Sequence, residues 1–86
     1  MEHTEIKQLL IDIIAGETGL SKEMDCDANF MQLGIQSITL MKIQMEIAKR
    51  CSVKIKFREF MQNNSVNQLA GHLKDRLETK EEDNGE

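Results

Sequence analysis

The segment FMQLGIQSITLMKIQMEIAKR, residues Phe30 to Arg50, decides the fold because it joins a glycine-containing loop to a helix with two apolar sides. With about 3.6 residues per turn, a helix from Ser37 to about Arg50 carries two apolar stripes on nearly opposite faces. One stripe consists of Leu40, Ile43 and Ile47, and the other of Ile38, Met41 and Met45. We expect the first to face the core and the methionine-rich second stripe to be exposed to protein partners, because thioether side chains adapt to different surfaces. Burial of both stripes between neighbouring helices is the alternative.

Ser37 follows a predicted turn at Leu33-Gly34 and stands in the first turn of this helix. A serine hydroxyl at a helix start commonly accepts a hydrogen bond from a free backbone N–H, which contributes about 1 kcal/mol. The same position also suits a phosphate group, because the free N–H groups and the positive end of the helix dipole attract anions. Ser37 is therefore either a structural cap or an attachment point for a phosphodiester.

Length and composition restrict the class of protein. The 86 residues suit one domain, and the absence of proline together with few strand-like runs favours an all-helical bundle. With the segments described below, we expect an all-α fold, a small four-helix bundle with a long first loop and a short third helix. The net charge of −4 argues against a nucleic-acid-binding protein. The first residues lack the apolar core of a signal peptide, and no apolar run approaches the roughly 18 residues of a membrane span. We expect a cytoplasmic protein that does not bind membranes.

Apolar periodicity predicts helices on both sides of the central one. The first runs from Thr4, its expected N-cap, to Gly16 or Thr18, and Gly16 and Gly19 end it. A short helical turn is expected at 57–63. The side chains expected to face the core from these two segments are Ile6, Leu9, Leu10, Ile13, Ile14, Phe57, Phe60 and Met61.

Ser65 is expected to open the last helix, and Gln68 three positions later completes a capping box. The core stripe of this helix is Val66, Leu69, Ala70, Leu73 and Leu77. The segment 79–86 is charged and carries no apolar side chain. We therefore expect one domain at 1–78, followed by a disordered tail or a linker.

Two connections lack helical periodicity. Residues 20–36 form a long loop for so small a domain, and the side chains expected to pin it to the core are Leu20, Met24, Phe30 and Leu33. Val53, Ile55 and Phe57 alternate with lysines, as in a β-strand. So short a segment without a partner strand cannot make a sheet, and we expect an extended connection packed against the helices.

Few residues offer catalytic or metal chemistry. Cys26 and Cys51 lack the spacing of metal ligands, and we expect two reduced thiols rather than a disulfide. His3 and His72 are expected on the solvated surface. Ser37 then has no general base, and we expect no catalytic residue and no metal site.

Together these features resemble the phosphopantetheine-binding carrier proteins of the acyl and peptidyl type, over about Ile6 to Leu77. Leu33-Gly34-Ile35-Gln36-Ser37-Ile38 is similar to the attachment motif of that family, in which the serine carries the prosthetic group. The segment FREFMQNNSV, residues 57–66, resembles the family's passage from the third helix to the fourth. Two motifs at this separation make the resemblance specific.

Some residues depart from the family pattern. Gln36 stands where the family usually has Asp, or His in many peptidyl carriers, and Asn64 replaces the proline common before the fourth helix. The central helix carries Lys42, Lys49 and Arg50 with Glu46 alone, so it lacks the acidic face typical of carriers in fatty-acid synthesis. The resemblance therefore points to the polyketide or nonribosomal-peptide branch.

The resemblance implies that Ser37 receives 4′-phosphopantetheine from coenzyme A, with Gly34 and Gln36 as the flanking motif, and that the arm holds acyl or aminoacyl cargo as a thioester. It implies a non-catalytic monomer that meets a phosphopantetheinyl transferase and the loading, condensing and modifying enzymes of an assembly line. The residues expected to contact these partners are Ile35, Ile38, Met41 and Met45. The alternative is an unmodified helical adaptor, with Ser37 as a plain cap and the exposed stripe as its binding face.

Overall fold

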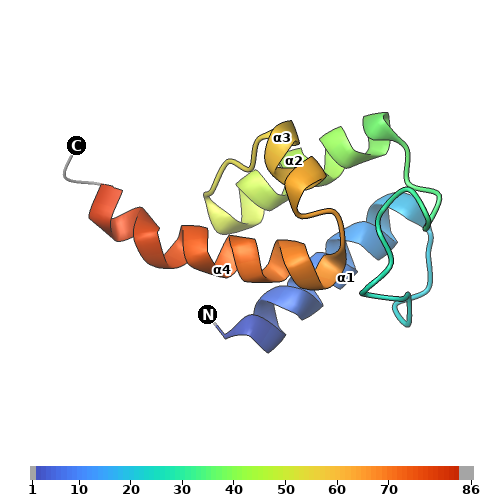
Figure 1. Ribbon diagram of the computed structural model, residues 1–86, viewed down its shortest axis with the longest axis horizontal. Coiled ribbons are helices and arrows are strands. Elements are labelled where there is room, and N and C mark those ends of the chain that lie inside the picture. The colour runs from blue at the N-terminus through green and yellow to red at the C-terminus, as the bar shows by residue number, and fades with distance from the viewer. Residues whose placement is uncertain (1, 84–86) are drawn as a thin grey trace.

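Four helices make up the part of the chain that the structure, a computed structural model, describes, residues 2–83. They are α1 (His3–Thr18), α2 (Ser37–Cys51), α3 (Phe57–Gln62) and α4 (Val66–Asp83). The helix α1 packs against both α2 and α4, and the short α3 packs against α2 (Figure 1). This arrangement confirms the predicted all-α bundle with a long first loop and a short third helix.

Buried side chains from all four helices form one hydrophobic core. The predicted apolar stripes of α1, α2 and α4 face this core, as expected. Leu9 of α1 and Leu77 of α4 are only partly buried, at the edge of the core. The rings of Phe30 and Phe60 lie with their centroids 6.3 Å apart in a tilted arrangement, which joins the first loop to α3. The buried members from the helices are Ile6, Leu10, Ile11, Ile13, Ile14, Leu40, Ile43, Ile47, Phe60, Val66, Leu69, Ala70 and Leu73.

The N-terminal end of α1 differs from the prediction, whereas its C-terminal end at Thr18, followed by Gly19, is one of the two ends predicted. Its N-cap is Glu2, and the expected cap Thr4 is an exposed residue inside the helix. The backbone N–H of Glu2 donates to the Glu5 carboxylate over 2.9 Å. The side chain of Glu5, in the first turn of α1, therefore caps the start of the helix. Gly16 does not end α1 but lies within it. Gly19, with a φ of 80°, is the left-handed residue that terminates the helix.

The short α3 buries fewer side chains than the sequence predicts. Phe60 is fully buried, whereas Phe57 is 37% and Met61 50% exposed. The prediction that both point into the core was therefore wrong. A helix of six residues has fewer than two turns, so only one of its side chains reaches the core while its neighbours remain at the edge.

The long first loop is pinned as predicted. Phe30 is buried, and Leu20, Met24 and Leu33 are partly buried against the core. The backbone N–H of Phe30 also donates to the carbonyl of Asn64 over 2.8 Å, which ties the loop to the turn before α4. The loop is thus held by apolar anchors and by main-chain hydrogen bonds.

The connection between α2 and α3 is extended and packs on the helices, as expected from its alternating pattern. Val53 and Ile55 are buried, and the lysines between and after them are exposed. At the start of α4, the Ser65 hydroxyl accepts a hydrogen bond from the Gln68 N–H over 3.2 Å, which confirms Ser65 as a cap.

The backbone of α4 continues to Asp83, so residues 79–83 are helical. From the sequence, we expected these residues to belong to a disordered tail or a linker. The rest of that segment, 84–86, lies outside the described residues, and the domain boundary at 78 stays a prediction. Cys26 and Cys51 do not form a disulfide. Within residues 2–83, no helix combines the length and the apolar character that crossing a bilayer requires.

Candidate functional site

Ser37 is the first residue of α2, and its side chain is exposed. The N-cap of α2 is Gln36, whose side chain makes no capping hydrogen bond. Among the described residues, none forms a hydrogen bond with the Ser37 hydroxyl. The structural role of a cap, which Ser65 fills for α4, is therefore not filled by Ser37 in α2.

The chain reaches Ser37 through a turn that depends on Gly34. Gly34 has a φ of 81°, in the left-handed region that favours glycine, and its N–H donates to the Met31 carbonyl over 3.0 Å. The next N–H, that of Ile35, donates to the Phe30 carbonyl over 3.0 Å. These bonds fold the loop back on itself directly before the helix. The predicted turn at Leu33-Gly34 is confirmed.

Ile35 is part of the core and not of the surface. Its side chain is only 3% exposed and packs with the buried residues of the bundle. Placing Ile35 among the partner-contacting residues was therefore wrong, because the turn at Gly34 directs the residue that follows inward. Burial of Ile35 fixes the chain two residues before Ser37.

The two sides of α2 differ in exposure, as its two stripes predict. Leu40, Ile43 and Ile47 are buried against the bundle. Ile38, Met41 and Met45 are 63%, 54% and 64% exposed. The alternative in which both stripes are buried is thereby excluded, and α2 presents an apolar face to its surroundings next to Ser37.

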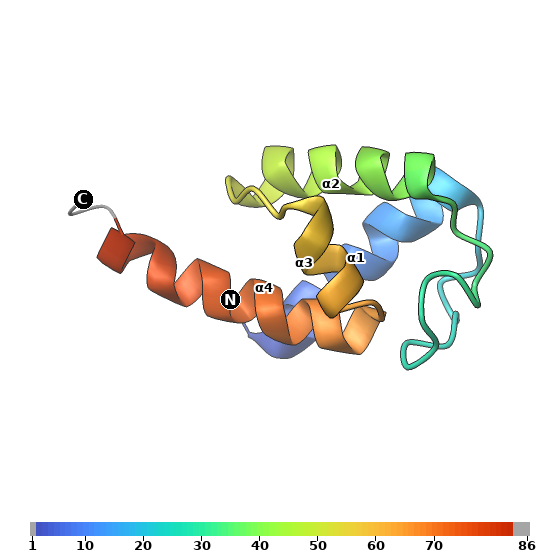
Figure 2. The same cartoon turned by 45° about the horizontal axis from the view of Figure 1, so that its top comes forward.

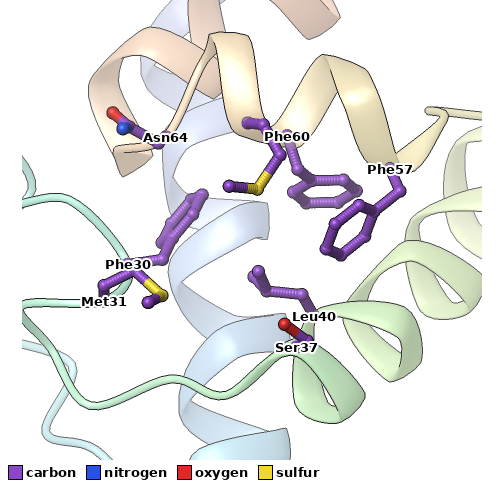
Figure 3. Close-up of a pocket in the computed structure, with 8 residues that line it drawn as sticks. Phe30, Met31, Ser37, Leu40, Phe57, Phe60 and Asn64 are labelled. Atoms are coloured by element: carbon purple, nitrogen blue, oxygen red, sulfur yellow. The ribbon is translucent and has the colours of Figure 1, made fainter.

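A cavity of about 130 Å³ opens beside Ser37, between the first loop, α2 and α3. Figure 3 shows the Ser37 hydroxyl next to Leu40 at one side of it, with the rings of Phe57 and Phe60 opposite. The residues that line it are Phe30, Met31, Ser37, Leu40, Phe57, Phe60, Met61 and Asn64. None of them is charged.

The sequence did not predict this cavity. Met31, Phe57 and Met61 come from a loop and from a very short helix, and neither segment is long enough for a periodic pattern to show which way a side chain points. One signal was present: Phe57 ends the alternating run that begins at Val53 and also starts α3. A large apolar residue at such a junction is a candidate for the edge of the core.

One side of α3 is held by a polar cluster. Oε1 of Glu59 accepts hydrogen bonds from His72 and Arg76 of α4, and Oε2 accepts the backbone N–H of Lys56. His72 was expected on the solvated surface, and that prediction was wrong, because its ring is partly buried against Glu59. The cluster ties α3, which forms one wall of the cavity, to α4.

The protonation of Glu59 follows from this setting. Burial raises the pKa of the Glu59 carboxyl. Hydrogen bonds from His72, Lys56 and Arg76, together with the positive charge of Arg76, outweigh burial and lower the pKa from 4.5 to about 2. Glu59 is therefore a carboxylate at neutral pH, and it stabilises the fold without belonging to the surface around Ser37.

The surroundings of Ser37 fit a covalently attached phosphodiester. The hydroxyl is exposed and makes no hydrogen bond to the described residues, so it is open to substitution. It lies at the positive end of the α2 dipole, where anions are stabilised. The cavity beside it has no charged lining residue that would repel a phosphate.

Comparisons with known proteins agree with this geometry. Residues 8–73 match the family model described as "Phosphopantetheine attachment site". The chain is also similar to the protein named polyketide synthase PksM of Bacillus subtilis (strain 168), with 30% identity over 71 residues. That match covers 81% of this chain and 2% of the synthase, so the chain spans only a small part of this relative's length. Because the family model covers most of its residues, the chain belongs to the phosphopantetheine-attachment family, and its cofactor is covalently bound 4′-phosphopantetheine.

Proposed function

We propose that the chain is a carrier protein that holds acyl or aminoacyl intermediates on a 4′-phosphopantetheine arm attached to Ser37. The observation that carries the proposal is the exposed Ser37 hydroxyl, which stands at a helix start and has no structural hydrogen bond among the described residues. When bound, the group supplies a terminal thiol that holds the cargo as a thioester.

Attachment requires a separate enzyme. The Ser37 oxygen forms a bond to the phosphorus that carries pantetheine, and the adenosine bisphosphate part of coenzyme A leaves. The serine proton must pass to a base, and no described carboxylate or imidazole is hydrogen-bonded to this hydroxyl. A phosphopantetheinyl transferase supplies that base and is the first partner of the chain. The carrier itself performs no catalysis.

The cavity beside Ser37 gives apolar atoms near the attachment point a place out of water. Its lining of Phe30, Leu40, Phe57 and Phe60 with neighbouring methionines is mostly apolar. A volume of about 130 Å³ suits only a small group. We therefore propose that short apolar parts of the arm or the cargo rest there between transfers.

Partner enzymes dock next to the serine on the exposed face of α2. Ile38, Met41 and Met45 form an apolar surface that the fold leaves uncovered. A surface of three such side chains is small, which suits short-lived complexes that permit exchange among loading, condensing and modifying enzymes. Ile35 is excluded from this surface because it is buried.

Two observations support the proposed pathway. The similar protein from Bacillus subtilis is named a polyketide synthase, and α2 carries three cations with the single carboxylate of Glu46. We propose a place in polyketide or nonribosomal-peptide biosynthesis, in which the carrier works as a monomer, either by itself or as one domain of an assembly line.

The proposal is tested by incubating the chain with coenzyme A and a broad-specificity transferase and measuring the intact mass. The wild type should gain the mass of one phosphopantetheine and Ser37→Ala none. Thr39→Ala, which removes a neighbouring hydroxyl of α2, is the matched control and should be modified like the wild type. A modified Ser37→Ala chain would refute the site. An unmodified wild type would favour the adaptor that binds partners without a prosthetic group.

A further inference from the structure

The exposed face of α2 combines its apolar stripe with positive charge. Lys42 follows Ile38 by four residues and Lys49 follows Met45 by four, and residues at this spacing share one side of a helix. Both lysines are exposed. In Figure 2, α2 runs along one edge of the molecule, and the exposure of Ile38, Met41 and Met45 shows that this face is open to a partner.

Positive charge is concentrated in and after α2. The segment 42–58 contains six Lys or Arg residues and one Glu, a net charge of +5, although the whole chain carries −4. The remaining residues therefore carry −9. All six cations are exposed, and they are Lys42, Lys49, Arg50, Lys54, Lys56 and Arg58.

Most of this charge is not neutralised within the molecule. Glu46 pairs with Arg50 over 3.1 Å and with Lys49 over 3.9 Å, and it is the single carboxylate of α2. Among the side chains of residues 2–78, no carboxylate forms an ion pair with Lys42, Lys54, Lys56 or Arg58. The apolar stripe is thus bordered by Lys42, which forms no ion pair with the described side chains, and by Lys49, which shares the single negative charge of Glu46 with Arg50.

We infer that the α2 face, defined as Ile38, Met41 and Met45 with Lys42 and Lys49, docks on protein surfaces that place carboxylates around an apolar patch. This inference rests on the proposed function, because it names the chemistry of the partners that meet the loaded carrier. The apolar centre supplies contact area, and the lysines select the partner and steer its approach. A partner with a basic surface is repelled at the same positions.

The negative charge outside residues 42–58 favours a protein as the partner of the α2 face over a nucleic acid or an anionic membrane. A nucleic acid or an anionic membrane presents negative charge over a wide area, and the net −9 outside 42–58 would be repelled by it. A protein can instead present a small acidic patch of matching size. The three apolar side chains also need an apolar counterpart, which a phosphate backbone does not offer.

The test uses two synthetic amphipathic helices as probes, identical except that the leucine stripe of one is bordered by glutamates and that of the other by lysines. The probes are titrated into the chain while the methyl resonances of Met41 and Met45 are followed by NMR. At low ionic strength the glutamate peptide should bind about tenfold more tightly, and the preference should shrink as salt is added.

Charge-reversed variants show whether the lysines of the α2 face cause the preference for the glutamate peptide. The double variant Lys42→Glu with Lys49→Glu should reverse the preference. The matched control, Lys7→Glu with Lys22→Glu, changes the net charge equally on α1 and the first loop and should retain it. No preference, or a preference that the α2 variant keeps, would overturn the inference. The same holds if the α2 face binds phosphatidylglycerol vesicles or a second copy of the chain in place of the glutamate peptide.

Failure of this inference is separable from failure of the proposed function. A chain that accepts phosphopantetheine at Ser37 but shows no preference between the peptides loses only the acidic-partner inference. A chain that prefers the glutamate peptide but is never modified loses the carrier function.

Discussion

The carboxylate of Glu59 on α3 accepts a hydrogen bond from the guanidinium of Arg76 on α4 over 2.6 Å. The two residues are far apart in the sequence, and their contact holds the short third helix in place. His72 donates to the same oxygen, and the other oxygen accepts the Lys56 N–H at the start of α3. A six-residue helix cannot be stable by itself, so its position depends on such contacts.

Glu59→Gln should destabilise the fold by about 1–3 kcal/mol at neutral pH, because it removes a charge that accepts several hydrogen bonds. The folded-state pKa lies below the unfolded value, so the carboxylate's contribution is present above about pH 4.5 and is lost as the pH falls towards about 2. Urea unfolding followed by circular dichroism should show the gap between variant and wild type closing over this range. Glu78→Gln, at an exposed carboxylate paired with Lys74, is the control and should change stability by less than about 0.5 kcal/mol. Equal losses in the two variants would contradict a special role for Glu59.

The two faces of α2 should respond differently to substitution. Met41→Glu places a charge on the exposed stripe and should leave the unfolding free energy within about 0.5 kcal/mol, whereas Ile43→Ala on the buried stripe should cost about 2–5 kcal/mol. Met41→Glu should also lower kcat/KM for modification by a transferase about tenfold, because it places a charge in the apolar surface that we propose for docking. Chemical unfolding measures the change in stability. Transferase kinetics at saturating coenzyme A, with the carrier as the varied substrate, measure the change in kcat/KM. Loss of helix in Met41→Glu would show that the stripe supports the core.

Much of the fold could be predicted because its determinants are local. The apolar stripes of α2 and α4 are periodic over several turns, and the turn at Gly34 needs only a glycine to form. The position of Ser37 at the start of α2 was predicted for the same reason, since it stands where the loop ends and the helical period begins. Each of these patterns extends over a few neighbouring residues, so it can be recognised without knowing which other segments pack against it.

The features that the sequence did not predict correctly concern residues whose positions depend on contacts with distant parts of the chain. The partner of His72 is Glu59 on another helix, and no spacing within α4 reveals that contact. Ile35 looked like a surface residue because it flanks Ser37, but the hydrogen bonds of the preceding turn direct it inward. The cavity beside Ser37 likewise forms from three separate segments.

Two serines at helix starts should differ in their effect on stability. Ser65 is buried and its hydroxyl accepts the Gln68 N–H, so Ser65→Ala should cost about 0.5–2 kcal/mol. Ser37 is exposed and makes no such bond, so Ser37→Ala should change stability by less than about 0.5 kcal/mol. Urea unfolding of the two variants in parallel measures the contrast. A loss at Ser37 as large as that at Ser65 would show that its hydroxyl is structural.

Two glycines offer a matched test of how the chain is led into α2. Gly34 has a φ of 81° and no atom within 4 Å of the place where a Cβ would stand, so Gly34→Ala is opposed by backbone strain alone and should cost about 1–2 kcal/mol. Gly16 has equal space but lies in the helical conformation of α1, so Gly16→Ala should stabilise the fold by about 0.5–1 kcal/mol. Because the turn at Gly34 positions the residues before Ser37, Gly34→Ala should also slow modification by a transferase, while Gly16→Ala should not. Thermal unfolding and the rate of mass increase distinguish the two sites, and opposite signs of the stability change are the expected result. If Gly34→Ala were as stable and as rapidly modified as Gly16→Ala, the left-handed turn would have no part in presenting the serine.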